Sequence, residues 1–140
     1  MHDKNCIFCK IINKEIPSSI VYEDDDVMAF LDISQTTKGH TLVIPKDHYQ
    51  NFLATPSEVS NKVMEVAKRI GMAQIDMLHA EGVNILTNVN EAAGQSVMHF
   101  HVHVIPRYAN TDGFKLTFED NSEKDLNLPS IATKINQGLK

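Results

Sequence analysis

Three histidines alternate with apolar residues in the run His99-Phe-His101-Val-His103-Val-Ile-Pro106. A β-strand sends successive side chains to opposite faces, so this alternation predicts a strand over residues 98–105 with all three imidazoles on one face. The phenylalanine and the valines between them would face the hydrophobic core. Histidine is the side chain whose ordinary pKa lies nearest neutral pH, so three in one row indicate a site of chemistry.

The composition narrows the class of protein. The chain has 140 residues, 42% of them hydrophobic, and a net charge of −5. This length and apolar content predict one domain with a hydrophobic core. The acidic balance argues against nucleic-acid binding, which requires a basic face. No apolar run approaches the ~20 residues of a membrane span, and the first residues lack a signal-peptide pattern, so we expect a cytoplasmic protein with no membrane partner.

Short apolar runs predict about five strands. They lie at residues 20–22, 27–31, 41–45, 83–88 and 98–105. Most are joined by short connections, which favour antiparallel pairing. The expected fold class is α+β, an antiparallel sheet with its helices gathered to one side.

One long helix is expected between the third and fourth strands. Thr55 and Glu58 fit a capping box with Pro56 at the first helical position, and Gly82 is a plausible stop signal. Apolar residues recur at helical spacing between these two ends. Shorter helices are expected near the two termini, over residues 6–13 and 129–139.

The histidine row has three interpretations. It could simply face solvent, it could ligate a metal ion, or His101 could attack an electrophile and form a covalent intermediate while its neighbours set its tautomer. The preceding residues favour nucleophilic catalysis. Gly94 lets backbone N–H groups approach an anion closely, and Gln95 and Ser96 offer an amide and a hydroxyl to phosphate oxygens or a leaving group.

Cys6 and Cys9 are the only cysteines and have Cys-x-x-Cys spacing. Two cysteines without a secretion signal do not make a disulfide scaffold. The pair could be redox-active, could be two thiols packed as small apolar residues, or could supply half of a zinc site. His48 is a candidate for a further zinc ligand.

Three separate motifs resemble the histidine triad (HIT) superfamily. Residues 88–107 resemble its signature, in which three alternating histidines follow a Gly-Gln-Ser approach. Residues 29–34 and 38–46 are similar to the family's nucleotide-pocket segment, and residues 6–12 resemble the Hint-like bacterial branch. The resemblance implies a HIT-like fold for a single domain, residues 1–140, with a core at about 6–108 and a tail at 109–140.

The resemblance also implies an activity. It points to a nucleotide hydrolase or transferase that acts at the α-phosphate of nucleoside 5′-monophosphate derivatives, such as a purine nucleoside phosphoramidate, through a covalent nucleotidyl-histidine. His101 would be the nucleophile, and His103 and His40 would belong to a histidine relay. Asp32 would hold the ribose hydroxyls, because a carboxylate can accept two hydrogen bonds, and Ile33 would wall the base.

The remaining residue roles come from the same resemblance. Asn88, Gln95 and Ser96 would contact the phosphate or the leaving group, with Gln95 and Ser96 in the catalytic group. A structural zinc ion would be held by Cys6, Cys9, His48 and His99. The resemblance further implies a homodimer in which two five-stranded sheets join.

Three other functions stay open at this point. One is a dinucleoside polyphosphate hydrolase of the Fhit-like kind. Another is a nucleotide-binding or scaffold protein whose turnover is incidental. The last is a metalloenzyme with a catalytic ion among His99, His101 and His103, which would leave Asp32 and the Gly-Gln-Ser approach unexplained.

Overall fold

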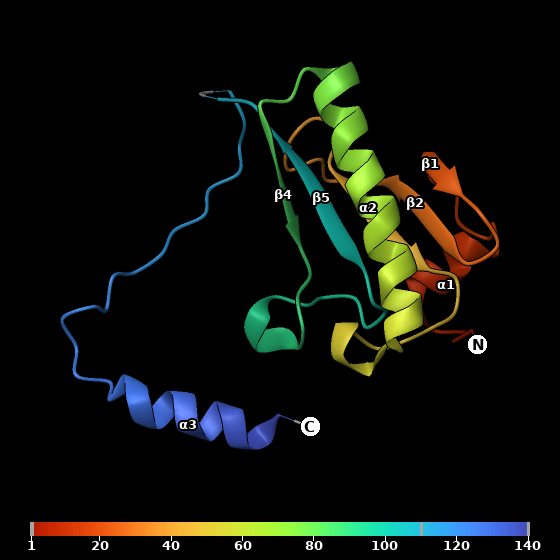
Figure 1. Cartoon of the computed structure of the whole chain (residues 1–140). Coiled ribbons are helices and arrows are strands. Elements are labelled where there is room, and N and C mark those ends of the chain that lie inside the picture. Colours follow the sequence, from red (N-terminus) through yellow and green to blue (C-terminus); the bar gives the residue numbers. More distant parts are fainter. Residues whose placement is uncertain (1, 110, 140) are drawn as a thin grey trace.

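The computed structural model describes residues 2–109 and 111–139. Figure 1 shows a sheet crossed by one long helix. The five strands have the order β1-β2-β3-β5-β4, and each neighbouring pair is antiparallel. Their bounds are β1 Ile20–Glu23, β2 Val27–Leu31, β3 Thr41–Pro45, β4 Gly82–Leu86 and β5 Val102–Arg107. The α+β class and the five antiparallel strands are confirmed.

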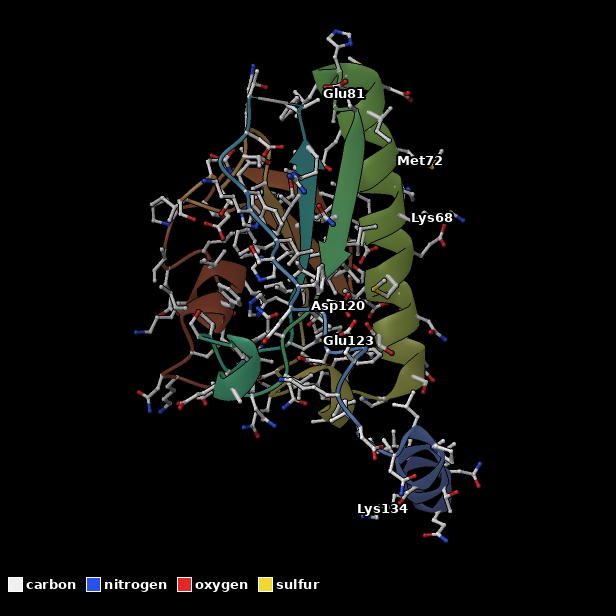
Figure 2. The ribbon with its side chains drawn as sticks, turned by 90° about the vertical axis from the view of Figure 1, so that its left-hand side faces the viewer. Lys68, Met72, Glu81, Asp120, Glu123 and Lys134 are labelled. Atoms are coloured by element: carbon white, nitrogen blue, oxygen red, sulfur yellow. The ribbon has the colours of Figure 1, made fainter. Side chains whose placement is uncertain are left out.

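The helices are distributed over both faces of the sheet. The α-helices are α1 Ile7–Ile12, α2 Ser57–Leu78 and α3 Leu128–Gly138, and the 3₁₀ helices are η1 Phe52–Ala54 and η2 Glu91–Ala93. Figure 2 shows α1 and α2 on opposite sides of the sheet. The expectation that the helices gather to one side was therefore wrong.

The central strands explain why both faces are covered. β2 and β3 are continuous apolar runs, buried along nearly their whole length, and such runs are typical of strands covered on two faces. One face packs against α2, and the other packs against α1. The residues on the α2 side include Val27, Ala29, Val43, Phe100, Val102 and Val104. Those on the α1 side include Phe8, Met28, Phe30, Leu42 and Ile44.

The predicted ends of α2 were wrong. The helix begins at Ser57, its N-cap is Pro56, and no side chain caps it. The Thr55 hydroxyl instead donates to the Asn51 carbonyl at 2.8 Å, because Thr55 is the C-cap of η1. At the other end His79 terminates the helix in the left-handed conformation, with φ 60°, and Gly82 already belongs to β4.

The histidine strand is shorter than predicted. β5 begins at Val102, so His99 and His101 precede it in irregular backbone. The Phe100 N–H donates to the Tyr49 carbonyl at 2.6 Å rather than to a strand neighbour. The predicted alternation nevertheless holds, since Phe100 and Val102 are buried on the α2 side and both preceding histidines contact Phe8 of α1 on the other side.

In the described part of the chain, no helix is long and apolar enough to cross a membrane.

Candidate active site and metal centre

The hydrogen bonds of His101 determine its tautomer. Its Nδ1 lies 2.7 Å from the carbonyl oxygen of His99. A carbonyl can only accept, so Nδ1 carries the hydrogen and the free lone pair lies on Nε2. The Thr87 hydroxyl donates to the His101 carbonyl at 2.7 Å and anchors the backbone at the same residue. In the neutral ring, Nε2 of His101 is therefore the nitrogen with an available lone pair.

Two further imidazoles, those of His103 and His40, lie next to His101. The rings of His101 and His103 are 5.0 Å apart, and His103 Nδ1 lies 3.0 Å from His40 Nε2. His40 Nε2 is also 3.8 Å from a carboxylate oxygen of Asp32. The structure thus brings Asp32 and His40 next to His101 and His103, which lie more than sixty positions later in the sequence.

The protein keeps these histidines neutral. Burial is the main cause that lowers the pKa of His103 to about 4, and the neighbouring His101 and His40 contribute to the same shift. Burial also lowers the pKa values of His40 and His101. At neutral pH each ring therefore has one N–H donor and one lone pair, as a nucleophile and a relay require.

Asp32 stays ionised beside them. Burial alone would raise the pKa of its carboxyl, but hydrogen bonds from the hydroxyl and the N–H of Ser34 hold it below the usual value. Both bonds fall on Oδ1, at 2.6 and 2.8 Å. The other oxygen faces His40, and the carboxylate retains acceptor capacity for a ligand.

An apolar cavity of about 680 Å³ adjoins this group. Asp32 is the charged residue of its lining, and Ile33, also on the lining, is fully exposed. The other lining residues come mainly from α1, the turn after it and β2, and include Ile7, Phe8, Ile11, Ile16, Phe30 and Leu31. A volume of this size, mostly apolar with one carboxylate, suits a planar base with an attached sugar.

Gln95 has a different position from the one expected. Its side chain is buried, and its oxygen accepts the Asn90 N–H at 2.9 Å. Its amide nitrogen donates to the carbonyls of Gln50 and Val97, at 2.7 and 3.0 Å. These backbone bonds hold the loop before β5, so direct contact between this amide and a phosphate would require them to break.

Ser96 and Asn88 are not among the residues that line the large cavity. Ser96 is exposed and lines a smaller cavity, of about 300 Å³, together with Cys6 and His48. Asn88 is half-buried, and its amide lies beneath Gly94, where an added Cβ would come within 3.7 Å of Nδ2. Their roles at a phosphate stay predictions.

A second cluster joins the two cysteines to two histidines. Cys6, Cys9, His48 and His99 place one ligand atom each within 4.8 Å of one another. His99 Nδ1 lies 3.4 and 3.6 Å from the two sulfurs and 3.1 Å from His48 Nδ1, and Cys9 Sγ lies 3.4 Å from His48 Nδ1. Ligands of one tetrahedral zinc lie roughly 3.3–3.8 Å apart, because the bonds are about 2.0–2.3 Å long.

The hydrogen bonding of His99 also fits a metal ligand. Its Nε2 donates to the Pro45 carbonyl at 2.9 Å, so the lone pair lies on Nδ1 and faces the cluster. Metal-bound histidines are commonly oriented in this way by their second nitrogen. Burial raises the pKa of the Cys6 thiol to about 11, so a cation would have to displace its proton on binding. These four residues could hold a metal ion.

Asp32, His40 and His103 also place one ligand atom each within 4.8 Å of one another. His40 Nδ1, however, is buried and has no hydrogen-bond partner among the described residues. If His40 bound a metal ion through Nε2, its hydrogen would lie on Nδ1. That buried N–H would have no acceptor, which is costly. The group therefore fits a hydrogen-bonded relay better than a second metal site.

Phe8 is a site residue that the sequence reasoning missed. Its ring lies 5.1 Å from that of His101 and 5.9 Å from that of His99, edge to face in both cases. It also lines the large cavity. Its position between the two cysteines was the available signal, since a side chain between two metal ligands on a helix turns toward another face.

Known proteins of similar sequence and structure identify the family of this chain. The HIT domain model matches residues 13–110. The Protein hit of Bacillus subtilis is 46% identical over 138 residues, which cover 97% of this chain and 95% of that protein. Crystal structures of a Bacillus anthracis HIT family protein and a B. subtilis member superpose with TM-scores of 0.91 and 0.92. They have 47% and 45% identity, and each covers 98% of this chain and 99% of its own.

Two further matches concern the chemistry of the site. A zinc-bound histidine triad family protein from Mycobacterium smegmatis is 35% identical, with a TM-score of 0.76, and covers 96% of this chain and 98% of its own. The Arabidopsis thaliana adenylylsulfatase HINT3 is 39% identical over 74% of this chain and 52% of its own length. On the domain match and these identities, the chain belongs to the HIT family.

Proposed function

We propose that this protein hydrolyses nucleoside 5′-monophosphate derivatives at the α-phosphate through a covalent intermediate on His101. One observation carries the proposal: the bond from Nδ1 to the His99 carbonyl leaves the Nε2 lone pair free, beside a cavity whose lining includes Phe8 and Asp32. Relatives described as a hydrolase and as a nucleotide-binding protein support the same class of chemistry.

In the first step Nε2 of His101 attacks the α-phosphorus. A nitrogen–phosphorus bond forms and the bond from phosphorus to the leaving group breaks. The leaving group keeps the electron pair and takes a proton from the solvent, which the water consumed in the second step returns. The modified imidazole keeps its Nδ1 hydrogen and becomes cationic. The His99 carbonyl stabilises that charge through the existing 2.7 Å hydrogen bond.

In the second step water attacks the same phosphorus. The bond to Nε2 breaks, its electron pair returns to the imidazole, and the nucleoside monophosphate leaves. Over both steps water supplies a hydroxyl to phosphorus and a proton to the leaving group. Two displacements replace one difficult substitution, which is the usual advantage of a covalent intermediate.

His40 and His103 supply a directed donor for the phosphate. His40 Nδ1 has no hydrogen-bond partner in the described part of the chain. This favours the tautomer with hydrogen on Nε2, because a buried lone pair costs less than a buried unpaired N–H. His40 then donates to His103 Nδ1, and His103 carries its own hydrogen on Nε2. In our proposal this N–H, close to the His101 ring, stabilises charge on the phosphoryl oxygens.

We propose zinc as the ion of the cysteine–histidine cluster. The two thiolates and two imidazoles match the donor set of closed, four-coordinate structural zinc sites. Cys6, Cys9, His48 and His99 would then tie α1 to the backbone just before β5. When bound, zinc would supply structural cross-linking and no open position for substrate.

We also propose a cytoplasmic homodimer that pairs the free edges of two β4 strands. β4 is an edge strand of the sheet, and its Ile85 is 43% exposed. An edge of this kind is suited to pairing with another strand. Cys6 and Cys9 are not joined in a disulfide, as expected in a reducing compartment.

Mass spectrometry of the protein quenched during turnover tests the covalent intermediate. The wild-type protein should gain one nucleotidyl group, located on His101. His101→Ala should lose turnover by a factor on the order of 10⁴ or more and should still bind a nucleoside monophosphate. Turnover near the wild-type rate by this variant would refute the mechanism.

The substrate is tested by rates measured side by side. We propose adenylylated compounds with a small leaving group, supported by the name of the HINT3 relative. Adenosine phosphoramidate and adenylylsulfate should therefore be cleaved with higher kcat/KM than a diadenosine polyphosphate. The opposite order would identify a dinucleoside polyphosphate hydrolase instead.

A further inference from the structure

The end of the chain lies apart from the sheet. Figure 1 shows the segment after β5 running past β4 and ending in α3, at the end of the molecule opposite the segment's start. All described residues from 115 to 139 are exposed except Ser130, which is half-buried. α3 has no buried residue. The segment is therefore not held by packing against its own domain.

The direction in which this segment leaves the domain is nevertheless determined. Arg107, the last residue of β5, forms an ion pair with Asp112 at 2.9 Å and donates to Asn84 at 2.7 Å. It also donates to the Phe114 carbonyl at 3.2 Å and stacks over that ring at 4.7 Å. The segment thus begins from a well-anchored point.

α3 has one unpartnered apolar face. Its exposed apolar residues follow helical spacing, at Leu128, Ile131, Ile135 and Leu139. The Asn127 side chain accepts the Ser130 N–H at 3.4 Å and caps the helix. A cap alone does not maintain an 11-residue helix, since isolated helices below about 12–15 residues are marginal in water. The apolar face needs a surface to cover it.

The related crystal structures support the detached position. Two Bacillus proteins match this chain over 98% of its length with TM-scores above 0.9. A different place for residues 115–139, about a sixth of the chain, would be incompatible with such scores. Two separate proteins share the arrangement, and a lattice accident would not reproduce it. Another copy of the chain is the partner that both crystals have in common.

We propose that α3 packs on the C-terminal half of α2 in a second copy, and that the exchange is reciprocal. This rests on the β4-edge dimer proposed above. A two-fold axis that pairs two β4 edges antiparallel reverses the second molecule end for end. The C-terminal end of its α2 then reaches the end of the molecule where α3 lies, on the same side of the sheet (Figures 1 and 2).

The receiving surface on α2 is apolar and outward-facing. Met72 and Ile75 lie almost one turn apart and are 59% and 47% exposed. Figure 2 shows Met72 pointing away from the sheet. Two exposed apolar side chains on a helix that otherwise buries its inner face give α3 a matching helical ridge.

Photo-crosslinking of the full-length protein tests this arrangement. With p-benzoylphenylalanine in place of Ile135 and a mixture of ¹⁴N- and ¹⁵N-labelled chains, we expect covalent dimers of mixed label, joined to the peptide that contains Met72 and Ile75. The same probe at Gln137, on the opposite face of α3, should give few covalent dimers. Adducts confined to one chain, or equal dimer yields from the two positions, would overturn the proposal.

A matched pair of charge variants gives a second measurement. Ile131→Glu with Ile135→Glu should raise the dimer dissociation constant at least about tenfold by analytical ultracentrifugation. Thr133→Glu with Gln137→Glu adds the same charge to the other face of α3. This pair should leave the dimer dissociation constant within about twofold of the wild-type value. Neither pair touches the sheet, so loss of folding does not confuse the result.

The outcomes separate this inference from the proposals it rests on. A monomeric wild-type protein would refute both the β4-edge dimer and the exchange of α3. A dimer unaffected by the Ile131/Ile135 pair would refute only the exchange. Neither measurement uses turnover, so the His101 mechanism stands or falls independently.

Discussion

The imidazole of His99 faces His48, with the two Nδ1 atoms 3.1 Å apart, while its own carbonyl accepts the hydrogen bond from His101. One residue therefore belongs to the cysteine–histidine cluster through its side chain and contacts His101 through its backbone. Phe8 contacts both rings from α1.

Removing the proposed zinc ion should weaken nucleotide binding as well as stability. α1 carries Cys9 on one face and, through Phe8 and Ile11, part of the cavity wall on another. Without the cross-link the wall loses its anchor, and affinity for a nucleoside monophosphate should fall about tenfold by calorimetry. By reciprocity the nucleotide should tighten metal binding by the same factor.

The control is Lys10→Ala, which changes the same helix without touching a ligand. It should keep one metal ion per chain and the full nucleotide affinity. Cys9→Ser should lose both. A Cys9→Ser protein that melts at a lower temperature yet binds nucleotide unchanged would show that the metal cluster and the cavity are independent.

Asp32→Asn should weaken binding of a ribonucleotide but not of its dideoxy analogue. The carboxylate oxygen that faces away from Ser34 is the proposed acceptor for the ribose hydroxyls. Replacing a charged acceptor by an amide should cost about 1.5–3 kcal/mol, or roughly 10–100-fold in Kd. Equal losses for adenosine monophosphate and the 2′,3′-dideoxy form would place the ribose elsewhere.

Gln95→Met should lower stability rather than act on substrate contact alone. It would leave three backbone groups without their partners, those of Asn90, Gln50 and Val97. We expect a loss of about 2–4 kcal/mol in the free energy of unfolding, measured with urea. Ser96→Ala, at the exposed neighbouring position, should stay within about 0.5 kcal/mol. A stable Gln95→Met protein would argue for a direct role at the phosphate.

Stability should decrease as the pH falls from 6.5 toward 4. The pKa of His103 is about 4 in the folded protein, against an ordinary value of 6.5. In that window the unfolded chain binds more protons, so acid favours unfolding, and the stability present above pH 6.5 is lost. With allowance for solvent screening we expect about 1–2 kcal/mol from this residue.

Urea unfolding at pH 7.5 and pH 5 measures this effect in the wild-type protein and in His103→Gln. The variant has no titrating group at this position, so its stability should depend less on pH. The same dependence in both proteins would mean that His103 does not stay neutral in the folded state.

Local sequence patterns predicted the histidine face well and its backbone less well. Alternation correctly placed Phe100 and Val102 on the core side. It could not show that β5 starts only at Val102, because the Phe100 N–H is taken by Tyr49, a residue about fifty positions earlier. Strand boundaries depend on such distant partners.

Competing local signals account for the errors at α2. Thr55 has the residue type of a helix cap, but η1 immediately before it takes up its hydroxyl. Gln95 is a second residue whose type suggested one role and whose contacts give it another. A glutamine beside a glycine and a serine suggests contact with phosphate, whereas burial gives it three backbone partners from separate segments.

The sequence by itself determined the five-strand pattern, the core-facing side of the histidine run and, through its motifs, the family and the four candidate metal ligands. These depend on periodicity and on residue types at short spacing. Only the tertiary structure decided the tautomer of His101, the shared role of His99, the covering of both faces of the sheet and the detached position of α3. Each of these depends on contacts between residues that are distant in the chain, and no local pattern encodes them.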